Sequence, residues 1–121
     1  MKGTLLCTAA LLALAGTVIA AETMYRYQEG EGMLKLYVSE ESGDVSLTLN
    51  TVNPNALATC DFESQSACNL TEEGLTCFTE EGMDPVTVRF IDDETLEVVS
   101  FPSEYCGVRG NALGRYQFVW D

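Results

Sequence analysis

Apolar and polar residues alternate with a period of two along most of the chain after residue 22, and turn residues interrupt the alternation. Residues 33–39 place three apolar side chains on one face, and residues 45–50 repeat this pattern after a turn at 41–44. A period of two indicates strands with one buried face. Short strands are predicted at residues 24–28, 33–39, 45–50, 57–62, 65–70, 75–79, 86–91, 95–100 and 115–120. We therefore expect an all-β fold, a small antiparallel meander of about eight strands that forms a barrel or a sandwich.

The first 20 residues have the pattern of a secretory signal peptide. Lys2 is their only charged residue, residues 5–19 are apolar, and Val18 and Ala20 suit the −3 and −1 positions of a cleavage site. We expect cleavage after Ala20, a single β domain over residues 21–121, and no membrane insertion once the signal is removed. The predicted location is the periplasm or the extracellular space.

Removal of residues 1–20 reduces five cysteines to four, namely Cys60, Cys68, Cys77 and Cys106. An even number of cysteines in a small exported domain predicts two disulfides. Three pairings are open from sequence alone. A two-residue turn centred on residues 72–73 places Cys68 opposite Cys77, close enough to bridge. This register favours the pairs Cys68–Cys77 and Cys60–Cys106.

Composition excludes several function classes. The chain has no His, six Lys and Arg residues, and 19 Asp and Glu residues, for a net charge of −13. Without His, neither Ser-His-Asp nor Cys-His catalysis nor a His-ligated metal site is available. A chain with so large an excess of acidic residues offers no positively charged surface of the kind that binds nucleic-acid phosphates. Removing Lys2 with the signal changes the net charge from −13 to −14.

Paired carboxylates are the remaining candidates for acid–base chemistry or calcium binding. The densest clusters are Asp92-Asp93-Glu94 and Glu80-Glu81 with Asp84. Both lie at predicted turns, which are open to solvent and do not form a substrate cleft, and the EF-hand spacing is absent. We therefore expect no enzymatic activity, no metal site and no cofactor. The triplet Asn69-Leu70-Thr71 fits an N-glycosylation acceptor, and we interpret it as a chance match unless the protein comes from a eukaryote.

The segment from Tyr105 to Tyr116 differs from the rest of the chain. It is rich in Gly and contains Arg109 and Arg115, two of the few cations. Tyr and Arg are frequent anchors of protein interfaces. The segment is therefore either a partner-binding loop or a plain connection into the last strand. For the first alternative, the candidate contact residues are Arg109, Gly114, Arg115 and Tyr116.

The second half of the chain resembles the bacterial periplasmic and membrane-bound inhibitors of c-type lysozyme. The similarity is carried by Leu75-Thr76-Cys77, Val86-Thr87-Val88-Arg89-Phe90, Leu96-Glu97-Val98, Gly114-Arg115-Tyr116 and Phe118-Val119-Trp120. Members of that family are small exported β-barrels, and a Ser-Gly loop ending in Tyr enters the lysozyme cleft. Gly114 and Tyr116 fit this loop, whereas Leu113 stands where the family has Ser.

The resemblance implies a protein–protein inhibitor of a cell-wall hydrolase such as lysozyme. Lysozymes are commonly cationic, and an acidic domain would be steered toward such a partner. Two alternatives stay open from the sequence. One is a small-ligand or ion-binding periplasmic module, and the other is a structural envelope domain without a discrete site.

Overall fold

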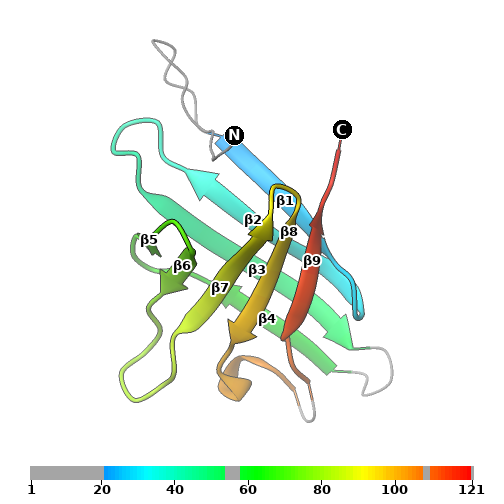
Figure 1. Ribbon diagram of the computed structural model, residues 1–121. Coiled ribbons are helices and arrows are strands. Elements are labelled where there is room, and N and C mark those ends of the chain that lie inside the picture. The colour runs from blue at the N-terminus through cyan, green and yellow to red at the C-terminus, as the bar shows by residue number, and fades with distance from the viewer. Residues whose placement is uncertain (1–20, 54–57, 108–109, 121) are drawn as a thin grey trace.

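The computed structural model describes residues 21–53, 58–107 and 110–120 (Figure 1). These residues form nine strands and one short 3₁₀ helix. The predicted signal peptide lies outside the described residues. The elements are β1 (Ala21–Tyr27), β2 (Glu31–Val38), β3 (Val45–Asn53), β4 (Ala58–Glu63), β5 (Asn69–Leu70), β6 (Gly74–Cys77), β7 (Val86–Asp92), β8 (Thr95–Ser100), η1 (Ser103–Tyr105) and β9 (Gly114–Phe118).

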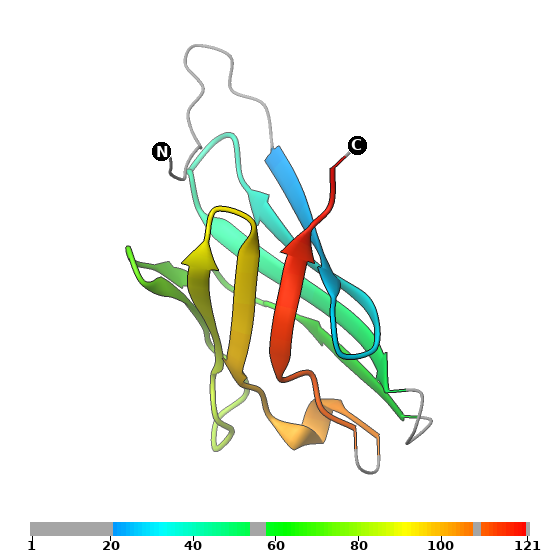
Figure 2. The same ribbon diagram turned by 45° about the vertical axis from the view of Figure 1, so that its right-hand side comes forward.

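All nine strands belong to one antiparallel sheet, in the order β4-β3-β2-β1-β9-β8-β7-β6-β5. Two meanders, β1–β4 and β5–β9, are joined where the first and last strands pair. The sheet curls so that β7 and β8 lie in front of β3 and β4 (Figures 1 and 2). The all-β prediction is confirmed, with nine strands in a curled half-barrel.

The strand predicted at residues 65–70 is reduced to β5. Residues 64–68 instead follow the edge of β3, because the Ser64 and Cys68 N–H groups donate to the carbonyls of Leu47 and Val45, at 2.9 and 2.7 Å. The chain between β4 and β5 therefore connects the two ends of the sheet. It leaves β4 with one edge that no long strand covers.

The core lies on the concave face of the sheet, and side chains from most of the strands contribute to it. In β3 and β4 the burial alternates strictly, as the period-two pattern predicts. Fully buried side chains of the core include Leu34, Leu47, Leu49, Leu75, Val86, Val88, Val98 and Tyr116.

Both predicted disulfides are present. Cys68 bonds to Cys77 across the β5–β6 hairpin, and Cys60 bonds to Cys106 across 46 residues of chain. The hairpin has the predicted register, with Leu70 opposite Leu75. Within the described part of the chain, no helix is long and apolar enough to cross a bilayer.

Candidate functional site

The half-barrel is open along a seam between the free edge of β4 and the segment that follows β6. The two disulfides bracket this seam, because Cys60 and Cys68 lie on the β4 side and their partners Cys106 and Cys77 lie on the other. A disulfide restrains the separation of the chains that it joins. The width of the seam is thus fixed at both ends.

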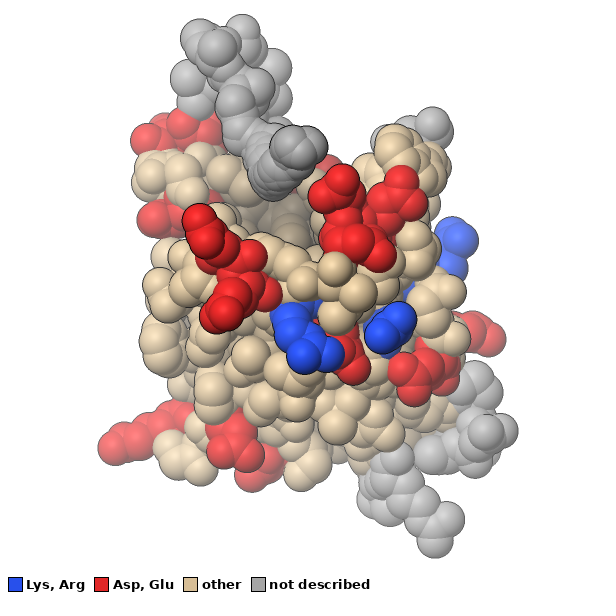
Figure 3. Space-filling model, viewed as in Figure 1, with Lys and Arg blue, Asp and Glu red and all other residues tan. Residues whose placement is uncertain are grey.

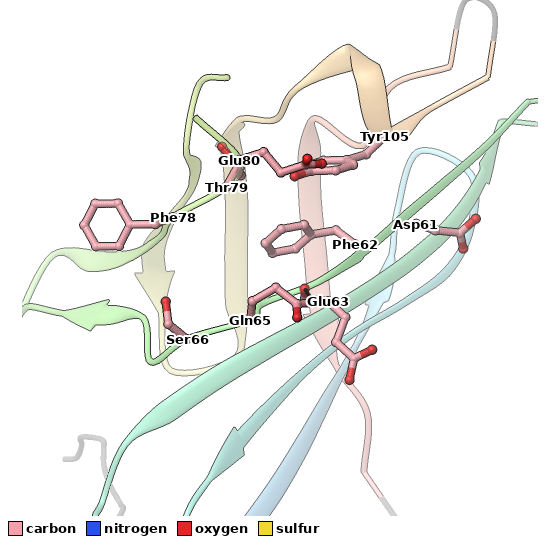
Figure 4. A pocket seen from close by; sticks show the side chains of 9 residues that line it. All are labelled: Asp61, Phe62, Glu63, Gln65, Ser66, Phe78, Thr79, Glu80 and Tyr105. Atoms are coloured by element: carbon pink, nitrogen blue, oxygen red, sulfur yellow. Dashed lines mark hydrogen bonds between the residues drawn. The ribbon is translucent and has the colours of Figure 1, made fainter. Parts of the chain in front are cut away.

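A cleft of about 400 Å³ lies in the seam between the two disulfides (Figure 4). We call it the seam cleft. It is lined by Asp61, Phe62, Glu63, Gln65, Ser66, Phe78, Thr79, Glu80 and Tyr105. All of these residues lie between Cys60 and Cys68, directly after Cys77, or directly before Cys106. A space of this size accommodates a few side chains or a small ligand.

Aromatic side chains line the interior of the seam cleft. The Phe62 and Tyr105 rings lie tilted against one another with centroids 5.3 Å apart, and the Phe101 ring contacts both. Phe62 is nearly buried, whereas Phe78 on the opposite side is 61% exposed and points away from the other two rings (Figure 4). The cleft therefore combines a fixed aromatic pair with one exposed ring at its margin.

Carboxylates form the margin of the seam cleft. Glu80 extends toward the Tyr105 ring, while Asp61 and Glu63 project from the other face of β4 (Figure 4). Asp61 is oriented by Asn50, whose Nδ2 donates to the Asp61 carboxylate at 2.6 Å. None of the nine lining residues is Lys or Arg. Among the described residues that line it, the cleft therefore presents carboxylates and aromatic rings but no cationic side chain.

A second, more open cleft of about 410 Å³ lies beside the loop that the sequence analysis singled out. Gly114 lines it with exposed Leu113 and Val99, and Glu29 contributes a carboxylate. The Arg115 N–H donates to Glu29 Oε2 at 3.1 Å, which holds the start of β9 against the β1–β2 turn. The Arg115 side chain is exposed, and Arg109 lies outside the described residues.

Tyr116 has a different environment from these neighbours, because its side chain is completely buried. Its ring stacks on Tyr27 with centroids 4.7 Å apart, and its hydroxyl donates to the Ala112 carbonyl at 2.7 Å. Burial raises the pKa of Tyr116 far above its ordinary value, and the nearby Tyr27 and Glu29 add to this increase. Tyr116 is therefore a core residue and is not available at the surface as a partner contact.

The densest carboxylate cluster, residues 92–94, forms the turn between β7 and β8. The Glu94 N–H donates to Asp92 Oδ1 at 2.8 Å, and this hydrogen bond is the main reason why the pKa of Asp92 is lowered. In the other cluster, Thr79 Oγ1 donates to the Asp84 carbonyl at 2.8 Å and closes the loop after β6. Within residues 21–53, 58–107 and 110–120, no three acidic or Cys side chains are arranged to hold a metal ion.

Sequence reasoning did not identify the seam cleft. One signal was present, since Asp61, Phe78 and Tyr105 each lie next to a cysteine. The Cys60–Cys106 disulfide, once known, brings Asp61 close to Tyr105, whereas Phe78 lies beside the other disulfide. Comparison of the chain with protein-family models, curated proteins and solved structures finds no match. The site is therefore interpreted from its own geometry.

Proposed function

We propose that the chain is an exported binding module for a cationic protein, with the seam cleft as its contact site. The observation that carries this proposal is the chemistry of the cleft, which offers aromatic rings and carboxylates but no Lys or Arg. A guanidinium or ammonium group beside Glu80 and Tyr105 would gain both a charge-assisted hydrogen bond and a cation–π contact.

The charge of the whole molecule supports the same proposal. Figure 3 shows carboxylates spread over one face, with only a few cationic side chains among them. A net charge near −14 would accelerate encounters with a basic protein and would be screened by salt. Two disulfides in a domain of this size are typical of oxidising compartments, which fits an exported protein.

Inhibition of a cell-wall hydrolase such as a c-type lysozyme is the specific form of this proposal. Its support is the resemblance of residues 77–121 to the lysozyme-inhibitor family, together with the common cationic character of lysozymes. Because Tyr116 is buried, the loop contact would rest on exposed Leu113 and Arg115. Leu113 lines the second cleft and Arg115 follows Gly114, which also lines it, so this loop would add a second contact to the one at the seam cleft.

The test is a binding measurement on residues 21–121, with a c-type lysozyme and with a non-hydrolase of similar size and positive charge. We expect salt-sensitive binding of the lysozyme and a loss of its muramidase activity. Glu80→Gln should weaken binding about two- to fivefold, because an exposed ion pair contributes up to about 1 kcal/mol. Asp93→Asn removes the same charge at the β7–β8 turn and should change affinity less than about twofold.

The outcomes separate the alternatives. Binding of both cationic proteins without loss of muramidase activity would support the binding module and remove the hydrolase as its target. Binding of neither protein at micromolar concentration would overturn the proposal. Displacement of the protein partner by a small organic cation would instead favour the small-ligand module, for which the cleft volume is also sufficient.

A further inference from the structure

The free edge of β4 presents backbone hydrogen-bonding groups to the seam. The Ser64 N–H donates to Leu47 on the β3 side, while the Thr59 carbonyl accepts from the Gly107 N–H on the opposite side, both at 2.9 Å. Successive residues of a strand direct their backbone groups to opposite edges. Residues 61 and 63, like Thr59, therefore direct theirs away from β3 and into the seam.

Backbone pairing along this open edge of β4 stops after a single residue pair. Cys60 and Cys106 form an isolated antiparallel bridge, and the residues before Cys106 form η1 instead of continuing the pairing with β4. The Glu63 carbonyl accepts an exposed hydrogen bond from Gln65 Nε2 at 3.2 Å. The seam cleft occupies the space where the next strand of the barrel would lie.

We propose that an extended segment of the partner, carrying Lys or Arg, adds to this edge as a short strand and completes the seam. This inference rests on the proposed function and names the form of the bound segment. Backbone pairing along residues 61–65 would supply the affinity. Glu80 and the outward carboxylates of β4 would select basic side chains, which gives the occupant its charge.

One substitution separates backbone pairing from charge. Glu63→Pro removes the N–H that faces the seam, and proline is tolerated on an edge strand when that N–H is not used within the sheet. Glu63→Gln removes the same charge but keeps the N–H. With a basic heptapeptide of alternating Lys and Val, we expect Glu63→Pro to weaken binding about tenfold and Glu63→Gln only about two- to fivefold.

Peptide variants provide a second test that leaves the protein unchanged. Two forms of the heptapeptide carry backbone N-methyl groups at either the odd or the even positions. One form should lose about tenfold in affinity and the other should bind nearly normally, because only alternate N–H groups of an added strand face β4. Binding should also slow hydrogen exchange at the Glu63 amide. A heptapeptide of alternating Glu and Val should not bind.

Several results would overturn the inference while leaving the proposed function intact. In the first, Glu63→Pro and Glu63→Gln weaken binding of the cationic protein equally. In the second, the two N-methylated forms bind with equal affinity. In the third, an amidated single lysine competes as strongly as the peptide. If no cationic protein binds but the heptapeptide does, in the N-methyl pattern described, the edge is confirmed as a peptide site and the proposed partner is wrong.

Discussion

Replacing Tyr116 by Phe tests whether this residue is a core residue, as the structure places it, or a partner contact. The substitution keeps the ring that stacks on Tyr27 and removes only the hydroxyl that donates to Ala112. A buried carbonyl that loses its donor costs about 1–3 kcal/mol. Because the packing is otherwise unchanged, the whole effect should appear in the free energy of unfolding.

The size of this effect decides which variant is informative. A domain of about 100 residues has a stability of roughly 5–15 kcal/mol. Tyr116→Ala would remove the ring as well as the hydrogen bond and cost about 4–8 kcal/mol, from the cavity and hydrogen-bond values together. That loss approaches the total stability. The Phe variant stays folded, and its melting temperature should fall by about 4–8 °C for each kcal/mol lost.

The assay is urea unfolding of residues 21–121 followed by far-ultraviolet circular dichroism. Fluorescence is less suitable, because the only Trp, Trp120, is 71% exposed in the folded protein. Tyr37→Phe is the matched control, since Tyr37 is 44% exposed on β2 and should change stability by less than about 0.5 kcal/mol. The midpoint should shift for Tyr116→Phe with an unchanged slope.

A Tyr27/Tyr116 double-mutant cycle extends the test to the stacked pair. The two rings should couple by about 0.5–1.5 kcal/mol. The reasoning is refuted if Tyr116→Phe leaves the urea midpoint in place but accelerates dissociation from a cationic partner. That result would place the ring at the interface and not in the core.

Three further outcomes are expected from the cross-links and the titrating groups. Replacing Cys68 and Cys77 by Ala should lower the free energy of unfolding, measured in urea, by about 2.7 kcal/mol. Loss of the other disulfide, which closes a longer loop, should lower it by about 4 kcal/mol. Tyr27 and Tyr116 have raised pKa values in the folded state, so their contribution to the free energy of unfolding should be fully present below pH about 10. Stability should fall as pH rises above this value, and it should fall less steeply in Tyr116→Phe. The pKa of Asp92 is lowered, so its contribution should be complete above pH about 4 and be lost as pH falls through the folded value, and Asp92→Asn should flatten the acid side of the stability profile.

Local sequence patterns predicted the strands and one disulfide because both depend on neighbours in the chain. The alternation in residues 45–50 gives the buried face of β3 directly. The Cys68–Cys77 pair follows from the geometry of a single hairpin, and the Cys60–Cys106 pair then follows by elimination. Neither step needs information about how distant strands pair.

The seam could not be predicted, because it depends on pairing between distant parts of the chain. Two long-range pairings determine whether the sheet closes. β1 pairs with β9, and residues 64–68 hydrogen-bond to β3 rather than to β6. Tyr116 illustrates the same limit. The alternation placed Tyr116 in the strand predicted at residues 115–120, and its Gly- and Arg-containing neighbours made it a candidate partner contact. The pairing of Tyr116 with Tyr27 places both rings in the core.

An open strand edge favours self-association unless something opposes it. Asp61 and Glu63 lie on the exposed face of β4, the strand whose edge is open, so two copies pairing antiparallel there would bring carboxylates opposite one another, which is destabilising. The same charges favour a strand that carries Lys or Arg. Protection of the edge and choice of partner therefore depend on the same two residues. Replacing both by Gln should weaken binding of a basic peptide and, at high protein concentration, shift sedimentation toward dimers. A double variant that loses the peptide but stays monomeric would show that edge protection has another source.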